Sequence, residues 1–171
     1  LGTICKVMTG PRVSSKNLVN EIPSKQAVSL IRIRDVRNGV VYGASSWLSP
    51  SSSNEMRPES RLQAGEILLS RTGTIGKVAI IQNDDADAVA SQNFCILRVT
   101  DKRMDPNFVS AYLQSEECLA WMRARAKGVT RQHLSLKLIA ELPVPVPNLK
   151  IQRATASAFL HSKSNALSLF L

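Results

Sequence analysis

The feature of this sequence that most constrains its fold is a change in hydrophobic periodicity at Asp105. Before Asp105, apolar residues form short runs separated by turn-forming Gly, Asn and Ser residues. After it, apolar residues recur at helical spacing, first between Phe108 and Leu119. Short apolar runs between turns are typical of strands, and a spacing of three to four residues is typical of helices. This order predicts an α+β fold that is β-rich at first, with a mid-chain helix and a C-terminal helical extension.

The part of the chain before Asp105 is predicted to consist of strands and the turns that join them. Val28–Arg34 alternates apolar with polar residues, which predicts a strand with Arg32 and Arg34 on its polar face. Residues 43–60 are rich in Ser, contain two Pro and lack periodicity, so a long loop is expected there. The other predicted parts are a tight Asn38-Gly39 hairpin, buried strands at Gly65–Ser70 and Val78–Ile81 around a glycine loop, and a strand at Phe94–Val99.

Helix signals begin where the periodicity changes. Asp105 as a cap and Pro106 in the first turn predict one helix that continues until Gly128. Ser135 predicts a cap for a short helix that runs through Ile139.

Spaced prolines then separate the last part of the chain from the rest. The prolines in residues 142–147 exclude a helix there, and Asn148 begins a final helical pattern. We therefore expect one domain at residues 1–147 and a separate helical segment at residues 148–171.

The charge of the chain is strongly positive and unevenly distributed. Its 22 Lys and Arg residues against 13 Asp and Glu residues give a net charge of +9. Residues 1–40 carry seven basic and two acidic side chains, residues 41–117 carry seven and ten, and residues 118–171 carry eight and one. Basic ends attract a polyanion, and nucleic acid is the commonest polyanion in a cell, although ribosomal and membrane-surface proteins share this trait.

Composition excludes several classes of protein. With 44% hydrophobic residues the chain can bury a core, which excludes global disorder. No apolar run approaches the ~20 residues of a membrane span, and the first residues lack a signal peptide, so we expect a soluble intracellular protein. Cys5, Cys95 and Cys118 are odd in number and widely spaced, so we expect core thiols without a disulfide or zinc site. His133 and His161 have no partner at catalytic or metal-binding spacing, so neither catalytic residues nor a metal are expected.

The predicted glycine loop is the first candidate binding site. Its Gly73–Lys77 segment lacks the upstream glycine and the following Ser or Thr of a nucleotide-binding P-loop. Its donors suit a DNA backbone, because two glycines let the chain approach a ligand closely. The alternative is an ordinary glycine hairpin with solvated cations. The candidate residues of this loop are Arg71, Thr72, Thr74 and Lys77.

A second basic cluster follows the predicted mid-chain helix and contains no acidic residue. Its cations and its amide, hydroxyl and imidazole donors can neutralise phosphates and reach base edges. The alternative is that the C-terminus of the helix merely attracts cations, but the basic stretch continues past Gly128. The candidate residues are Lys127, Thr130, Arg131, Gln132 and His133.

Two smaller groups are candidates for reading bases. Arg32 and Arg34 on one strand face can each bind guanine through two hydrogen bonds, although an ordinary solvated strand face is an equal alternative. Gln92 and Asn93, before the last predicted strand, offer amides of the kind that pair with adenine.

The order of these motifs is characteristic. GEILLSRTGTIGKVAII and GVTRQHLSLKLIAELPVPVPNLKIQ combine a glycine-lysine hairpin with a Gly-x-Thr segment that leads into a proline-rich stretch. In this order the motifs resemble the target recognition domain of type I restriction-modification specificity subunits, over nearly the whole chain. That family usually has Glu-Gln where this chain has Ile151-Gln152. Similar domains also occur at the C-terminus of large N6-adenine methylases, so such a fused methylase is an alternative parent.

The resemblance implies a non-catalytic domain that binds double-stranded DNA and reads one half of a split site. It implies no cofactor on this chain, because a separate N6-adenine methyltransferase (M) subunit would hold S-adenosylmethionine. A restriction (R) subunit would complete a prokaryotic, cytoplasmic complex with no membrane partner. The hairpin donors would lie near the DNA backbone, and the second cluster would lie on the DNA side.

The resemblance also implies that this chain is a piece of a longer protein. Residues 148–171 would start a conserved spacer helix of coiled-coil type, whose apolar stripe packs on a partner helix, unless it folds back on its own domain. The expected stripe is Ala154, Ala158, Leu160, Leu167 and Phe170.

Two other classes stay open. A general RNA-binding basic module would share the charge, but it usually has stacking aromatic residues, and only 5% of this chain is aromatic. An enzyme fragment would need a nucleophile or metal site that the sequence does not offer.

Overall fold

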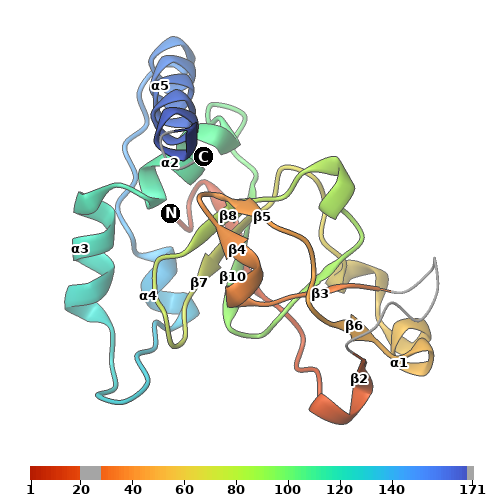
Figure 1. Cartoon of the computed structure of the whole chain (residues 1–171). Coiled ribbons are helices and arrows are strands. Elements are labelled where there is room, and N and C mark those ends of the chain that lie inside the picture. Colours follow the sequence, from red (N-terminus) through yellow and green to blue (C-terminus); the bar gives the residue numbers. More distant parts are fainter. Residues whose placement is uncertain (20–27, 169–171) are drawn as a thin grey trace.

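The computed structural model describes residues 1–19 and 28–168 and has a mixed α and β architecture (Figure 1). Strands come first and α-helices dominate after residue 105, which confirms the predicted α+β class. The strands are β1 (Cys5–Thr9), β2 (Leu18–Val19), β3 (Leu30–Ile31), β4 (Val36–Arg37), β5 (Val40–Val41), β6 (Trp47–Leu48), β7 (Ile67–Ser70), β8 (Val78–Ile80), β9 (Val89–Ala90) and β10 (Phe94–Val99). The α-helices are α1 (Pro50–Glu55), α2 (Pro106–Leu113), α3 (Glu116–Arg125), α4 (Leu136–Ala140) and α5 (Leu149–Ser168). Short 3-10 helices are η1 (Ser15–Asn17), η2 (Ile33–Asp35), η3 (Pro58–Ser60) and η4 (Asn83–Asp85).

A four-stranded antiparallel sheet in the order β1-β10-β7-β8 forms the centre of the fold. Alternate residues of its strands enter two different cores. Cys95 and Leu97 of β10 pack into one core, and Phe94 and Ile96 pack into the other. A sheet that is covered on both faces requires apolar residues on both, which is why Ile67–Leu69 of β7 and Phe94–Leu97 of β10 are continuous apolar runs in the sequence.

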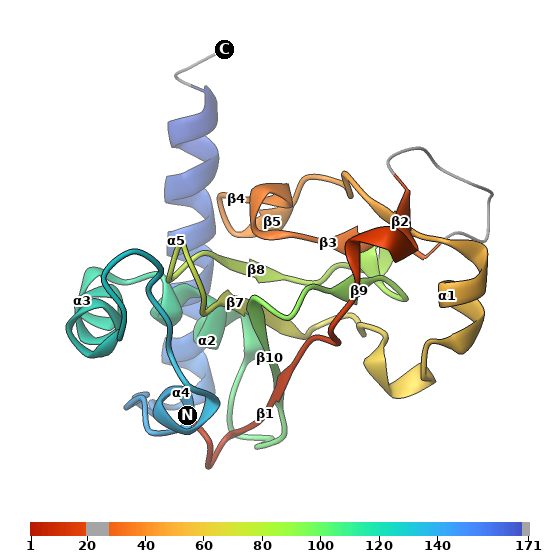
Figure 2. The same ribbon diagram turned by 90° about the horizontal axis from the view of Figure 1, so that it is seen from below.

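Helices cover one face of the sheet and short irregular strands cover the other. Phe108 of α2, Met122 of α3 and Ile139 of α4 belong to the first core. Ile31 of β3 and Val36 of β4 belong to the second. Figure 2 shows the result, with α3, α4 and α5 on one side of the molecule and β2, β3 and α1 on the other.

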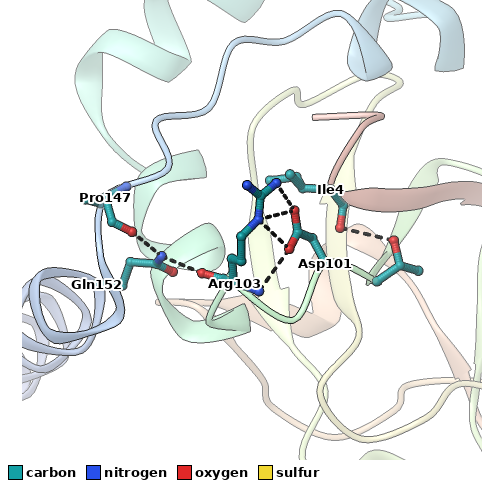
Figure 3. Close-up of polar contacts among 6 residues, drawn as sticks. Ile4, Asp101, Arg103, Pro147 and Gln152 are labelled. Atoms are coloured by element: carbon teal, nitrogen blue, oxygen red, sulfur yellow. Dashed lines mark hydrogen bonds and ion pairs between the residues drawn. The ribbon is translucent and has the colours of Figure 1, made fainter.

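The last helix, α5, packs on α2 and projects beyond the sheet (Figure 2). Gln152 on its buried face is fully enclosed. The Gln152 Nε2 donates to the carbonyl oxygens of Arg103 (2.8 Å) and Pro147 (2.7 Å), and its Oε1 accepts from the backbone N–H of Asp105 (2.8 Å). Figure 3 shows this amide between the two carbonyl groups. One side-chain amide therefore joins the start of α5 to the turn that precedes α2.

Three residues of the predicted apolar stripe of this helix have side chains that the structure describes. Ala154, Ala158 and Leu160 are exposed, and Ala156 is buried against the domain. Ala154 and Ala158 lie on the helix face opposite Ala156, whereas Leu160 lies one turn after Ala156 on the same side, so these residues do not form one stripe. The side chain of Leu167 and all of Phe170 lie outside the described residues. The coiled-coil assignment and the boundary between residues 147 and 148 stay predictions.

Several local predictions are confirmed. Asn38 and Gly39 have φ angles of 51° and 87° and join β4 to β5, as a tight hairpin requires. The last predicted strand coincides with β10, and Ser135 caps α4 by accepting from the N–H of Leu138. All three cysteines are free and buried, and burial raises the pKa of the Cys95 thiol to about 12.

The prediction of a strand over Val28–Arg34 is wrong beyond β3. The chain bends after Ile31 because the Asp35 carboxylate accepts a hydrogen bond from the backbone N–H of Arg32 (2.8 Å), which closes the 3-10 turn η2. Arg32 and Arg34 therefore lie on a turn, where a two-residue alternation no longer determines their directions.

Two further predictions need correction. Residues 43–60 are not a continuous loop, since they contain β6, α1 and η3, with Pro50 in the first turn of α1 and Ser49 as its cap. The single helix predicted between Pro106 and Gly128 is two helices. Ser115 adopts extended backbone and its hydroxyl accepts from the N–H of Cys118, so that it caps α3 and ends α2.

Candidate nucleic-acid interface

The glycine loop between β7 and β8 is held from inside by Ser70. The Ser70 hydroxyl accepts from the backbone N–H of Lys77 (2.8 Å) and donates to the carbonyl of Thr74 (2.6 Å). Gly73 and Gly76 have φ angles of 79° and 86°, in the left-handed region that glycine adopts without strain. The loop therefore has a fixed shape, and Thr74 is exposed at its tip.

The second predicted cluster is a closed loop after α3. The N–H of Lys127 donates to the carbonyl of His133 (3.0 Å), and the N–H of His133 donates back to that of Lys127 (2.8 Å). All side chains from Lys127 to His133 are exposed. The loop thus presents Lys127, Thr130, Arg131, Gln132 and His133 to solvent.

The structure brings these two loops together. The N–H of Gly73 donates to the carbonyl of Gln132 (2.9 Å), and the N–H of Leu134 donates to the carbonyl of Arg71 (2.9 Å). Thr72 Oγ1 lies 2.9 Å from Nδ1 of His133, and Nη1 of Arg71 lies 3.2 Å from its Nε2. A guanidinium only donates, so Nε2 accepts and the proton of the neutral ring lies on Nδ1, which donates to Thr72.

Asn93 connects the two loops to the start of β10. Its carbonyl accepts from the N–H of Arg71 (2.9 Å), and its Oδ1 accepts from Nη2 of Arg131 (3.1 Å). Three half-buried residues, Arg71, Thr72 and Asn93, and three exposed ones, Lys127, Arg131 and His133, together form a region that we call the Arg71–Arg131 surface. It presents several cations, and no acidic residue is among these six.

The remaining candidates line one groove beside this surface. Arg32 and Arg34 at the η2 turn line the same space of about 380 Å³ as Gln92 and Asn93, which precede β10. We call this the Arg32 groove. Asn93 belongs both to the groove and to the Arg71–Arg131 surface, so the two regions are continuous.

Lys77 differs from the other candidates because its charge is directed inward. Its Nζ donates to the carbonyl oxygens of Ile33 (3.3 Å) and Val36 (3.4 Å), at the two ends of the η2 turn. Lys77 thereby joins the glycine loop to the turn that carries Arg32 and Arg34. The predicted contact of Lys77 with a DNA backbone stays a prediction.

The pKa of His133 is lowered from its ordinary value, first by burial and then by the cations Arg71 and Arg131. The unfolded chain therefore binds the proton more readily than the folded chain, and stability is lost as the pH falls below about 6.5. We expect His133→Gln to make the fall in melting temperature between pH 7.5 and 5.5 shallower. The control for a substitution at this place is Gln132→Ala, which changes an exposed neighbour that does not titrate and should leave the profile unchanged. Parallel profiles for the wild type and His133→Gln would contradict this role of the ring.

Sequence reasoning missed two contributors to the site. Ser91 lines the Arg32 groove, and its buried hydroxyl has no hydrogen-bond partner among the residues that the structure describes. Ser45 accepts from Nε of Arg34 (2.7 Å) and fixes that side chain. The Ser-rich segment 43–60 gave no periodic signal that distinguished Ser45 from its neighbours. Ser91 precedes the candidates Gln92 and Asn93 in the sequence, but its burial depends on the tertiary arrangement.

Neither a metal centre nor a membrane helix is found in the described part of the chain. No group of three or more His, Cys, Asp and Glu residues is arranged to hold a metal ion there. No helix within residues 1–19 and 28–168 combines the length and the apolar character needed to cross a membrane.

Comparison with known proteins gives a consistent picture. The family model described as "Type I restriction modification DNA specificity domain" matches residues 1–166. The type I restriction enzyme EcoBI specificity subunit of Escherichia coli is 25% identical over 130 residues, which are 75% of this chain and 27% of that protein. This chain therefore spans about a quarter of the length of that relative.

Solved structures share the fold. A chain from a study of complex assembly and conformational transition in a type I R-M system has a TM-score of 0.73 at 17% identity. The match covers 99% of this chain and 38% of the chain in that structure. The HsdS subunit from Thermoanaerobacter tengcongensis has a TM-score of 0.67 at 15% identity, covering 98% and 37%. The type I S subunit from M. genitalium has a TM-score of 0.59 at 18% identity, covering 92% and 36%.

Proposed function

The chain belongs to the type I restriction modification DNA specificity domain family, and on that premise we propose that it binds duplex DNA and recognises one half of a split site. Contacts with phosphates would set its position on the duplex, and a few side chains would read base edges. In this proposal the chain carries out no chemistry and holds no cofactor.

The observation that carries the proposal is the joining of two basic loops at the Arg71–Arg131 surface. Arg71 and Arg131 come from segments distant in the sequence, yet both bond to Asn93. An array of cations on fixed backbone suits a polyanion of regular shape, since neutralising phosphates releases counterions. The net charge of +9 supports the same ligand class.

Membership of the family supports a proposal for the rest of the assembly. We propose that the longer protein containing this chain holds an N6-adenine methyltransferase subunit, which binds S-adenosylmethionine, over the DNA site. A restriction subunit would join the same complex in the cytoplasm of a prokaryote. The face of α5 that carries the exposed Ala154 and Ala158 is proposed to pack on a partner helix of that protein.

The test is fluorescence anisotropy of the 171-residue chain with random-sequence duplex DNA over a range of salt concentrations. We expect binding that weakens steeply with salt and is competed by duplex DNA better than by single-stranded DNA or RNA. A preference for RNA would support the general RNA-binding alternative and contradict the proposal. Absence of duplex binding at low salt would contradict it as well.

Arg131→Ala is expected to weaken binding to all duplex sequences alike. Loss of one phosphate contact should reduce the salt slope, the change of log K with log salt, by about 0.9. Arg103→Ala is the matched control, because it removes the same charge beyond the opposite end of β10, where Arg103 pairs with Asp101. Equal slopes for the wild type and Arg131→Ala would exclude a phosphate contact of Arg131.

A further inference from the structure

The two arginines of the Arg32 groove have different surroundings. The Nε of Arg34 donates to the hydroxyl of Ser45 (2.7 Å), and its Nη2 donates to that of Ser46 (3.4 Å). The Arg32 guanidinium, in contrast, has no hydrogen-bond or ion-pair partner in the described ranges 1–19 and 28–168. One guanidinium is thus fixed within the protein, and the other retains its donors for a ligand.

The backbone that carries Arg32 is nonetheless rigid. Its N–H donates to the Asp35 carboxylate (2.8 Å), and its carbonyl accepts from the N–H of Asp35 (2.9 Å). From the other side, the Lys77 ammonium donates to the carbonyl oxygens of Ile33 and Val36. A free side chain on a fixed turn loses less conformational freedom on binding than one on a loose loop.

The segment 91–93, which follows β9 and lies beside the end of β3, also has unused hydrogen-bonding capacity. The Ser91 hydroxyl is buried and, within the described residues, unpartnered. The Ser91 backbone is fixed, since its N–H donates to the carbonyl of Ile31 (2.9 Å). A buried hydroxyl without a partner costs free energy in the unbound protein, and a polar ligand removes that cost. Gln92 and Asn93 add amides on the same segment.

The groove leads directly onto the cationic surface. Asn93 lines the groove, while its Oδ1 accepts from Arg131 of the Arg71–Arg131 surface. A duplex whose phosphates lie on that surface would place base edges at the groove. Hydrogen bonding to bases, rather than charge alone, suits a site that one unpartnered guanidinium, a hydroxyl and two amides line together.

We propose that the Arg32 groove is the base-reading site of this domain and that Arg32 is a specificity-determining residue that donates to O6 and N7 of a guanine. This inference rests on the proposed duplex-DNA binding. A guanine offers two adjacent acceptors in the major groove, which the two terminal nitrogens of a guanidinium match. Arg34 and Lys77 are positioning residues in this arrangement, because their donors are engaged within the protein.

The experiment begins with selection of the preferred duplex by the wild-type 171-residue chain from a randomised pool. We expect a guanine whose replacement by another base weakens binding about tenfold. Replacing that guanine with 7-deazaguanine removes only the N7 acceptor, and this change should weaken wild-type binding about fivefold or more.

The decisive comparison measures the affinity of the Arg32→Ala variant for the same two duplexes. This variant should bind the guanine and 7-deazaguanine duplexes equally. Arg37→Ala is the matched control, because Arg37 is an exposed arginine at the end of β4, outside the groove. Arg37→Ala loses the same charge and should retain the difference in affinity that the wild type shows between the two duplexes. Ser91→Ala is a second variant, expected to fold at least as stably as the wild type and to show a weaker preference for the guanine.

Failure of this inference is distinguishable from failure of the proposed function. If Arg32→Ala weakens binding to both duplexes alike and keeps the ratio of the two affinities, Arg32 contacts the DNA backbone. The inference is then overturned, although the proposed binding of duplex DNA stands. A selected sequence in which no guanine responds to 7-deaza substitution also overturns it. If the wild type binds no duplex at any salt concentration, the proposed function fails, and the inference fails with it.

Discussion

Replacing Gln152 with Leu is expected to lower the melting temperature of this protein strongly. The amide makes three hydrogen bonds from a fully buried position, to Arg103, Asp105 and Pro147. A leucine side chain would fill similar space but leave two carbonyls and one N–H unpaired in the interface between α5 and α2. We expect a loss of about 3 kcal/mol or more, which in a domain of this size lowers Tm by about 6–12 °C.

Thermal unfolding of Gln152→Leu beside Arg153→Leu measures this effect. Arg153 is the exposed neighbour of Gln152 on the same helix, so its substitution should change Tm little. Amide hydrogen exchange in α5 should also become faster in Gln152→Leu, because the start of the helix is released. Equal Tm values for the two variants would show that packing, and not this amide, holds α5 to the domain.

Gln152 also illustrates what a motif reveals and what it omits. The family resemblance marked Ile151-Gln152 as a position without giving a physical reason for it. The structure supplies one, since the three groups that Gln152 bonds lie about 47 residues away along the chain or at the end of the proline stretch. Such a contact depends on tertiary arrangement, which periodicity does not record.

Three of the four strands of the central sheet, β7, β8 and β10, were predictable because each is determined locally, whereas β1 was not predicted. The strand β7 and the start of β10 are buried on both faces and are apolar runs, and the turn between β7 and β8 uses glycine. The errors occurred where one polar side chain redirects the backbone. Asp35 closes a turn within an alternating segment, and Ser115 interrupts a helical pattern. In both places a single hydrogen bond prevails over the periodicity of the apolar residues.

The candidate site was predictable in its parts but not in its assembly. The clusters at Arg71 and Arg131 stood out by composition alone. Their contact through Thr72 and His133, 61 residues apart, follows from the packing of α3 and α4 against the sheet. The inward direction of Lys77 and the buried hydroxyl of Ser91 have no counterpart in the sequence pattern, because both depend on which backbone lies opposite.

Gly10→Ala is expected to be the most damaging small substitution near the site. Gly10 is buried directly after β1, and an added Cβ would overlap the carbonyl oxygen of Ala90 and lie 2.7 Å from that of Ser91. Both are backbone atoms, so the segment between β9 and β10 must move as a whole. We expect a loss of about 3 kcal/mol or more in the free energy of unfolding, measured by denaturant titration.

Gly43→Ala is the control that separates lack of space from backbone strain. Gly43 has a φ of +94° and no atom near the added Cβ, so its substitution carries only the conformational cost of about 1–2 kcal/mol. Gly10 has no such positive φ, so its whole cost arises from contact. Because Ser91 is a wall of the Arg32 groove, Gly10→Ala should also weaken the preference for a selected duplex under conditions where the variant is folded. A variant that is destabilised yet keeps the full preference would show that the groove tolerates displacement of this wall.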